Sequence, residues 1–393
     1  MGVLIIKLRD SGIVMRTMAA VVFLTFTFLW IYHFQADVLA YAQHVFSDGQ
    51  THYNRLVGAL LITVILQVVQ LAVYAVLRLQ ARLHALTYYP SLVLLALLDA
   101  ICPSAGGQSS LSLWWLLLVP LTVVWLFAVK YANQMSRFDR KTSLQPLFSN
   151  FMWTNLLVLS LMMLGVTLTA NTNAVFHYRA RVETRLLQQR FADALQVGAK
   201  SLETDASLTM LRAYALARQG ELGESLFQYP VAGSSADLLP LTGSQSRLLR
   251  YPQDSLFRQL GALPRKGMTT AVYLDRLLRY GQATPLVADY LLCGQLVDRD
   301  LDAFARTLPL YYEVPDTLHP EASTLPRHYR EALTLYTHLR SHPVLEYHDA
   351  VSDEDYANLQ ELESQYRDPR ERHIRVKENY QGSYWYYYEY ARQ

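Results

Sequence analysis

The stretch FMWTNLLVLSLMMLGVTLTA, residues 151–170, runs directly into NTNAVFHYRARVETRLLQQR, residues 171–190. The first half carries no charged residue and is long enough to cross ~30 Å of hydrocarbon as a helix. The second half is rich in arginine, and its apolar residues recur with the period of an amphipathic helix. The stretch therefore predicts a membrane-spanning helix that leads, after a short Asn-Thr-Asn break, into a water-soluble helix. We expect an all-α chain with a transmembrane block at 1–170 and a soluble domain at 171–393.

Charge is distributed unevenly between these two parts, although the 393-residue chain has a net charge of only +2. Residues 1–170 hold ten basic and five acidic residues, whereas residues 171–393 hold 25 basic and 28 acidic residues. A slightly acidic soluble domain lacks the basic surface with which proteins bind nucleic acid, so we expect no nucleic-acid partner. The two cysteines, Cys102 and Cys293, are too few for a disulfide framework or a zinc motif.

Four further apolar runs precede the opening stretch, and together they predict a block of five membrane spans. The third run is short and contains Asp99. The fourth contains Pro120, which a span tolerates when neighbouring helices satisfy the freed carbonyl. The predicted spans are residues 13–34, 56–77, 86–101, 111–129 and 151–170.

Basic residues in the short loops predict the orientation of these spans, because cytoplasmic loops are enriched in lysine and arginine. If the N-terminus is inside, nine of the ten basic residues are cytoplasmic and only Arg55 lies in an outer loop. This asymmetry requires that the third and fourth runs either both cross or both enter the membrane as a re-entrant pair. We expect a multi-pass protein of a bacterial inner membrane, with a cytoplasmic N-terminus and a periplasmic soluble domain.

Polar residues within the predicted spans are candidates for a functional site, because polar side chains are costly in lipid. Gln67, Gln70 and Tyr74 recur at helical spacing and share one face of the second span. Two roles fit this face: a path for a polar substrate, or interhelical hydrogen bonds worth about 0.6 kcal/mol each. Asp99, near the outer interface, completes the candidate polar face, and Asn155 is interpreted as a contact between helices.

The soluble domain begins with pairs of short helices that are separated by turns. The segment AYALARQGELGE at 213–224 resembles the turn region of a tetratricopeptide repeat, a helical hairpin that recurs every 34 residues or so. A further pair is predicted at 286–297 and 301–312. The resemblance implies an α-solenoid-like stack whose concave surface binds a protein partner. Three aromatic residues of these pairs are candidates for the interaction surface: Tyr214, Phe227 and Tyr290.

The C-terminal segment NYQGSYWYYYEYARQ, residues 379–393, is crowded with aromatic residues. Three roles are open for it: a packed cap on the helical stack, an anchor at the membrane interface, or a ligand-stacking surface. Tyr384, Trp385 and Tyr387 complete the candidate interaction surface. Together with the multi-span N-terminus and the segment LPRHYREAL at 325–333, this tail resembles an uncharacterised family of Gram-negative inner-membrane proteins, a domain of unknown function.

The sequence contains no G-x-S-x-G, Walker or G-x-G-x-x-G motif, so we assign no catalytic residues and no cofactor. His338 and His342 have a metal-like spacing, but no third ligand accompanies them, and we predict no metal site. We expect a membrane-anchored helical-repeat scaffold that mediates protein–protein interaction at the cell envelope, with the lipid bilayer and a periplasmic protein as partners. The alternative is a membrane-embedded enzyme or transporter component that acts on lipid-linked or envelope substrates.

Overall fold

The computed structural model describes residues 2–79, 81–100, 111–135, 150–170, 173–314 and 325–391. Within these ranges the regular elements are all helical and no strand is present, which confirms the predicted all-α fold class. The chain divides into two compact units, unit 1 (Met1–His177) and unit 2 (Tyr178–Gln393), and each is described by itself. Cys102, the basic residues of 136–149 and the Asn171-Thr172 break lie outside the described residues.

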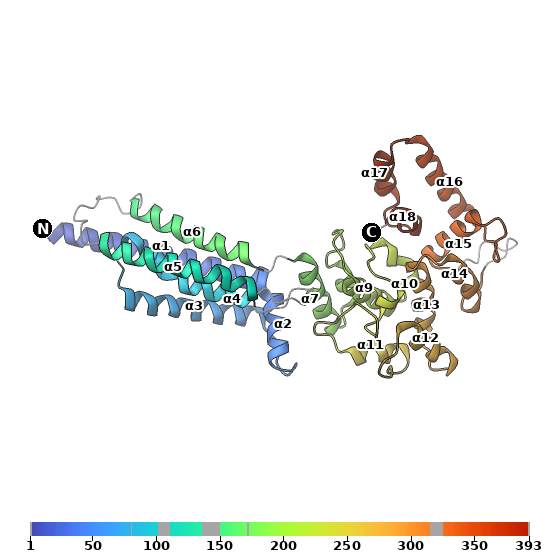
Figure 1. The fold of residues 1–393 in the computed structure, drawn as a ribbon, viewed down its shortest axis with the longest axis horizontal. Helices are drawn as coiled ribbons and strands as arrows, with labels where there is room; N and C mark the ends of the chain where they lie inside the picture. The colour runs from blue at the N-terminus through green and yellow to red at the C-terminus, as the bar shows by residue number, and fades with distance from the viewer. Residues whose placement is uncertain are drawn as a thin grey trace. The chain divides into compact units, whose positions relative to one another are not determined.

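Unit 1 is a bundle of long apolar helices (Figure 1). Its first helix, α1, continues through a π-helical turn, η1, into α2. The side chain of Asn54 caps the start of α3 by accepting hydrogen bonds from two backbone N–H groups, and α3 ends at Arg78 in the left-handed region (φ 46°). The elements are α1 (Gly2–Leu29), η1 (Trp30–Gln35), α2 (Ala36–Phe46), α3 (Arg55–Leu77), η2 (Ala81–Tyr88), α4 (Tyr89–Ala100), α5 (Leu111–Met135) and α6 (Asn150–Thr169).

Three helical segments of unit 1 are long and apolar enough to cross a membrane: Ile13–Phe46, Arg55–Leu77 and Met152–Thr169. The sequence predicts five spans, and the third and fourth runs account for the difference. α4 has 12 residues, or about 18 Å of helix, and follows a 3-10 helix, η2, that is kinked at Leu83. α5 has 25 residues, and the apolar segment found among its described side chains, which begin at Leu118, is Leu118–Tyr131. The described residues therefore provide three candidate spans rather than five.

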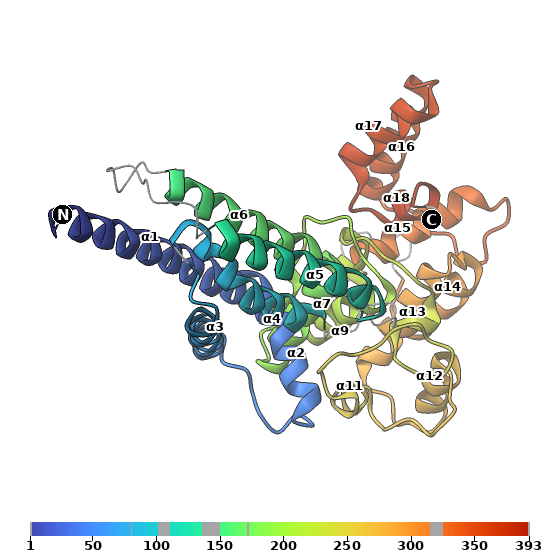
Figure 2. The same cartoon turned by 60° about the vertical axis from the view of Figure 1, so that its left-hand side comes forward.

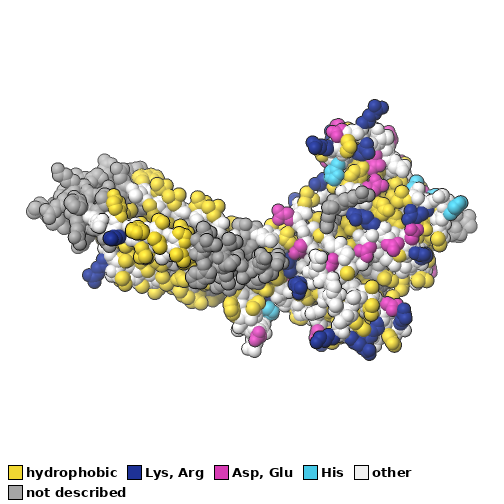
Figure 3. Space-filling model, in the orientation of Figure 1, with side chains coloured by type: hydrophobic (Ala, Val, Ile, Leu, Met, Phe, Trp, Pro, Cys, Tyr) yellow, Lys and Arg dark blue, Asp and Glu magenta, His cyan; other side chains and the backbone are white. Residues whose placement is uncertain are grey.

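The side chains of unit 1 are apolar both inside and outside. The interior is a cluster to which α1, η1, α2, α3, η2, α4 and α6 all contribute, and it includes Phe23, Tyr88, Leu92 and Leu159. Many outward-facing residues are equally apolar, and on α3 they include Leu61, Val64 and Val68, each more than half exposed. Figure 3 shows how hydrophobic side chains dominate the described surface of this unit. An apolar surface of this extent is compatible with membrane association.

Unit 2 is built from short helices and ordered loops. α7 crosses the boundary between the units and leads into α8 and α9. The elements are α7 (Ala174–Leu187), α8 (Phe191–Gln196), α9 (Ala206–Gln219), α10 (Leu222–Ser225), η3 (Leu226–Gln228), η4 (Ser235–Leu238), α11 (Gln253–Leu260), α12 (Thr270–Arg279), α13 (Pro285–Val297), α14 (Leu301–Thr307), η5 (Leu308–Leu310), α15 (Arg327–Leu339), α16 (Ala350–Gln365), α17 (Pro369–Tyr380) and α18 (Tyr384–Glu389).

The predicted helical pairs form, but their second helices are short. α8 packs on α9, α9 turns into α10 at Gly220 (φ 74°), and α13 turns into α14 beside Arg299 (φ 60°). α8 ends at Gln196, shortly before Gly198, which takes a left-handed conformation, and α10 has only four residues. A regular tetratricopeptide-like solenoid is therefore not established by these elements.

α9 forms the centre of unit 2, because every side chain from Ser207 to Ala217 is buried. η4 packs against α9 and α13. The carboxylate of Asp237 in η4 accepts backbone hydrogen bonds from Ser234 N (2.9 Å) and Gln245 N (2.6 Å), which orders the loop that follows. α16 and α17 pack side by side and extend away from the rest of the unit (Figure 2).

Candidate functional site

The predicted polar face of α3 is covered by η2. Gln67 Nε2 donates to Gln70 Oε1 at 2.8 Å, and Gln70 Nε2 donates to Thr87 Oγ1 at 2.8 Å. Thr87 Oγ1 in turn donates to His84 O at 2.8 Å. Gln70, Thr87 and His84 are buried. This chain of hydrogen bonds joins α3 to η2 and places neutral polar groups inside an apolar unit.

Tyr74 lies at one end of the same face and contacts two further elements. Its ring meets the ring of His84 edge-on, with 4.9 Å between centroids. The guanidinium carbon of Arg16, on α1, lies 4.8 Å from the Tyr74 ring centroid. Asn155 of α6 accepts a hydrogen bond from Ala85 N at 2.7 Å, which agrees with its predicted role as a contact between helices. Arg16, Tyr74 and His84 thus form a second polar group at the end of the bundle.

These contacts extend the predicted polar face of α3 to Thr87 and His84 on η2 and to Arg16 on α1, which the sequence did not indicate. Asp99 lies on α4, but its side chain is outside the described parts of the structure. The sequence pattern does not single out His84 or Thr87, because His84 falls between the predicted spans 56–77 and 86–101 and Thr87 is an isolated polar residue at the start of the latter. Their apolar neighbours, Leu83 and Leu86, were the available signal that this segment packs against the helices.

The predicted interaction surface lies in the interior of unit 2. All six candidate side chains are buried, with exposed fractions between 0% and 8%: Tyr214, Phe227, Tyr290, Tyr384, Trp385 and Tyr387. The structure corrects the prediction in this respect, since these rings pack between helices instead of facing solvent. For example, the Phe227 ring lies 5.0 Å from the ring of Tyr384 and 4.7 Å from that of Tyr387.

The aromatic tail is a packed cap, which was the first of its three predicted roles. Trp385 Nε1 donates to Glu331 O at 2.7 Å, and α18 thereby docks on α15. Tyr384 and Tyr387 hydroxyls donate to backbone carbonyls at the end of α13, at 3.2 and 2.8 Å. Each buried hydroxyl or indole N–H therefore has an acceptor, as burial of these groups requires.

Arg299 holds the other end of the tail. Its Nη2 donates to Tyr387 O (3.1 Å) and to Ala391 O (3.0 Å), at the C-terminal end of α18. Its guanidinium also lies 4.7 Å from the centroid of the Tyr387 ring. A cation at this position complements the unpaired carbonyls and the negative end of the helix dipole.

The LPRHYREAL segment connects the tail to the first helical pairs. His328 Nε2 accepts a hydrogen bond from Phe227 N at 3.2 Å, so Nδ1 carries the proton and donates to Glu331 Oε2 at 3.0 Å. Glu331 also accepts from Arg327 Nε (2.7 Å) and Tyr384 N (2.6 Å). Burial alone would raise the pKa of Glu331, but the bonds from His328 and Arg327 and from the tail hold it below its usual value. His328 and Glu331 thus join η3, α15 and α18.

A partly buried carboxylate, that of Asp289, lies between α13 and α15. Asp289 accepts hydrogen bonds from the hydroxyls of Tyr312 (2.7 Å) and Tyr329 (2.9 Å). Burial raises the pKa of Asp289, and the two phenol donors oppose this shift. The thiol of Cys293 lies 3.5 Å from the Tyr329 hydroxyl, and burial raises its pKa. A thiol of raised pKa is a poor nucleophile, so we assign this group a structural role.

Glu183 on α7 performs a similar task near the start of unit 2. Its carboxylate accepts hydrogen bonds from the backbone N–H groups of Leu249 (2.7 Å), Arg250 (2.5 Å) and Tyr251 (2.8 Å). Burial raises the pKa of Glu183, while these three donors and Arg179 act in the opposite direction. The contact fastens the 249–251 loop to α7.

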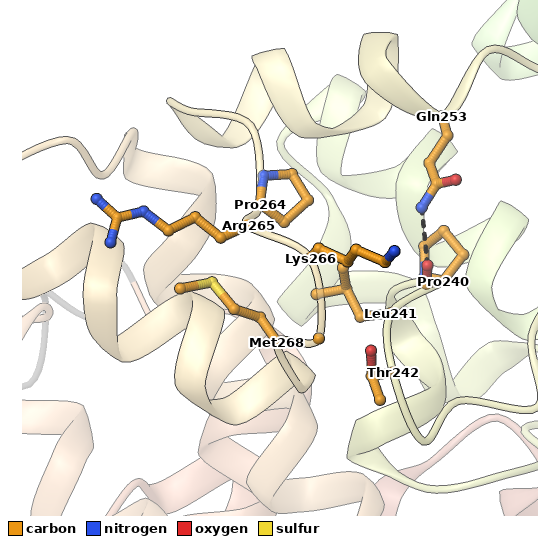
Figure 4. Close-up of a pocket in the computed structure, with 9 residues that line it drawn as sticks. Pro240, Leu241, Thr242, Gln253, Pro264, Arg265, Lys266 and Met268 are labelled. Atoms are coloured by element: carbon orange, nitrogen blue, oxygen red, sulfur yellow. Dashed lines mark hydrogen bonds between the residues drawn. The ribbon is translucent and has the colours of Figure 1, made fainter.

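A shallow pocket of about 360 Å³ lies between the segments 240–242 and 264–268 (Figure 4). Gln253 Nε2 donates to Pro240 O at 2.9 Å and closes one side. The Lys266 side chain extends toward these two residues, whereas that of Arg265 points the other way (Figure 4). None of the described lining residues is acidic, so the pocket favours a neutral or anionic small molecule. The lining residues are Pro240, Leu241, Thr242, Gln253, Pro264, Arg265, Lys266, Gly267 and Met268.

The expected likeness to a domain of unknown function is supported by comparison with known families. Residues 252–391 match a family of unknown function (DUF6057). The match includes LPRHYREAL and the aromatic tail up to residue 391, but not the multi-span N-terminus on which the resemblance was also based. No curated protein matches the chain, and no solved structure matches it. The matched region includes Arg299, His328 and Glu331, so the tail network described above lies entirely within it except for Phe227.

Proposed function

We propose that the chain is a membrane-anchored helical scaffold that mediates protein–protein interaction at the cell envelope. The main support is the contrast in surface between the units: unit 1 exposes apolar side chains on helices of membrane-crossing length, whereas unit 2 carries a mixed charged surface. A unit with an apolar exterior suits a bilayer, and a helical unit with ordered hairpins suits presentation of a protein-binding surface.

Three crossing helices support the same orientation as five. In this proposal α1–α2, α3 and α6 cross, while α4 and α5 enter from the cytoplasmic side as a re-entrant pair. An odd number of crossings leaves the basic loops inside, in keeping with the enrichment of cytoplasmic loops in lysine and arginine. Unit 2 is then periplasmic, in the inner membrane of a bacterium, and its hairpins act as a tetratricopeptide-like stack.

A pair of measurements tests this proposal. Two reporters are fused after Gln393, one that is active only outside the cytoplasm and one that is active only inside it. The first is expected to be active and the second inactive, and the opposite result would overturn the orientation. Crosslinking mass spectrometry on the full-length protein in native membranes is expected to join unit 2 to a distinct envelope protein. Crosslinks confined to this chain and to lipid would count against the scaffold role.

The alternative is a membrane-embedded enzyme or transporter component for lipid-linked or envelope substrates. One observation favours it: the hydrogen-bonded group of Gln67, Gln70 and Thr87 lies inside the apolar unit. Substitution of Gln67, Gln70 and Tyr74 by leucine, phenylalanine or methionine is expected to abolish the cellular phenotype if this reading is correct. An unchanged phenotype, with the protein still present in membranes, would exclude it.

A further inference from the structure

Two arginine–tyrosine pairs join α1 and η1 to α3. Arg16 lies over the ring of Tyr74 at 4.8 Å, and Arg55 lies over the ring of Tyr32 at 4.7 Å. α3 pairs with the earlier helix in the opposite direction, so its first residue meets Tyr32 and its last turn meets Arg16. The two pairs therefore lie at opposite ends of the same pair of helices.

The distance between these pairs is close to the thickness of a bilayer core. From Arg55 to Tyr74, α3 rises by about 29 Å at 1.5 Å per residue, and the hydrocarbon layer is ~30 Å thick. Arginine and tyrosine are both enriched at the membrane–water interface, where the charged or hydroxyl end reaches polar groups. Each pair is thus placed where lipid head groups would be.

The two guanidinium groups differ in their hydrogen bonding. Arg55 Nε donates to Tyr32 O, and its Nη2 donates to His33 O at 3.3 Å. Arg16 Nε is buried, and it has no acceptor among the residues that the structure describes. A buried N–H donor of a charged group is costly to leave unpaired. The Arg16 pair therefore requires an acceptor that the described protein does not supply.

A second unpaired nitrogen lies beside Arg16. His84 is 3% exposed, and its Nδ1 has no partner among the described residues. Its ring contacts Tyr74, so that Tyr74 lies against both His84 and Arg16. Of the carboxylates that the structure describes in unit 1, those of Asp37 and Asp48 follow Tyr32 in the chain and belong to the other end. The Arg16 end is thus cationic, with no described acid to neutralise it.

We propose that Arg16, which Tyr74 and the buried His84 hold in position, binds the phosphate of an anionic phospholipid head group. Phosphate oxygens are strong acceptors for a guanidinium, and a head group is the anion that is always available at this depth. An anionic lipid fits better than a zwitterionic one, because Arg16 already covers the Tyr74 ring on which a choline or ammonium group would pack. The inference rests on the proposed membrane anchoring of unit 1.

Lipid retention by the full-length protein tests the proposal. The protein is delipidated in neutral detergent, and binding of phosphatidylglycerol and phosphatidylcholine is compared by native mass spectrometry. Wild type is expected to prefer phosphatidylglycerol, and Arg16→Gln is expected to weaken this binding roughly tenfold to hundredfold, the effect of one charge-assisted hydrogen bond. Arg55→Gln is the matched control, since its guanidinium is already paired, and it is expected to leave lipid preference unchanged.

A second variant, a competition experiment and a membrane wash distinguish failure of the lipid site from failure of the proposed anchoring. His84→Ala is a second variant that retains all charged residues, and it is expected to weaken phosphatidylglycerol binding without affecting phosphatidylcholine. Equal loss in Arg16→Gln and Arg55→Gln, or no loss in either, would overturn the site. Full competition by inorganic phosphate would show a free-anion site instead of a lipid site. Release of wild type from membranes by a carbonate wash would instead overturn the proposed anchoring itself.

Discussion

The two units bury polar side chains in different ways. In unit 1 the buried groups are mainly neutral amides and hydroxyls such as Gln70 and Thr87, and several buried atoms have no described partner. In unit 2 a charged group, Glu331, is buried with three donors around its carboxylate. The desolvation penalty of a buried charge must be offset almost completely by hydrogen bonds and opposite charges. A neutral amide in a membrane has a smaller desolvation penalty, and each of its hydrogen bonds contributes less free energy. The difference predicts unequal sensitivity to mutation.

Replacing Glu331 is expected to have the largest effect. Glu331→Ala leaves His328, Arg327 and Tyr384 N without their acceptor, and loss of one partner from a buried charged group costs about 3–5 kcal/mol. Hydrogen exchange of the 381–391 peptide in the full-length protein measures the loss of tail docking. Glu331→Gln is the control, because it retains an acceptor for Tyr384 N and should lose less. If the 381–391 peptide were equally protected from hydrogen exchange in Glu331→Ala and in wild type, Glu331 would not be what docks the tail.

Glu331 also predicts that docking of the tail depends on pH, a dependence that we do not expect for the contacts of unit 1. The folded-state pKa of Glu331 is lowered, so its contribution to stability is present above the pKa of an unfolded glutamate, about 4.3. This contribution is lost as the pH falls through the lower folded-state value. Tail protection in wild type should therefore decrease in acid, below about pH 4. A parallel decrease in Glu331→Gln would show that another group is responsible.

Tryptophans in the two units are expected to respond differently to the same substitution. Trp385→Phe removes the indole bond to Glu331 O and leaves a space in a close-packed cap, at a cost of about 1–3 kcal/mol. Trp153→Phe alters an exposed position on α6 and should change stability by less than about 0.5 kcal/mol. Thermal unfolding of both variants in one detergent gives the comparison. If Trp153→Phe were the more damaging, unit 1 would not have the lipid-facing exterior that we propose.

Among the substitutions that remove a hydrogen bond, the smallest effect is expected for the buried amides of unit 1. Gln70→Leu removes the bond to Thr87, but Thr87 still donates to His84 O, so the loss should be about 0.6 kcal/mol. Unfolding by added sodium dodecyl sulfate from a mild detergent measures this difference. A loss of several kcal/mol would show that this contact is as critical to unit 1 as Glu331 is to unit 2.

The role of the aromatic tail could not be chosen from its sequence. Tyrosine and tryptophan serve equally well in a core, at a membrane interface or on a binding surface, and the tail has no periodicity that separates these roles. What decides its position is contact with remote segments: Glu331 lies 53 residues from Tyr384, and His328 lies 101 residues from Phe227. The contact of Arg299 with the tail could likewise not be predicted, because in the sequence Arg299 only lies between the predicted helices 286–297 and 301–312.

Local polarity and the 3.6-residue period report helix formation and apolar length directly, so they were enough to predict a helical chain with apolar helices of membrane length. The folded chain was needed to show that α4 is too short to cross alone, that η2 covers the glutamine face of α3, and that the six aromatic candidates are buried. Each of these depends on which segments pack together. The sequence pattern shows which face of a helix can be buried. Which segment covers that face depends on contacts between residues far apart in the chain.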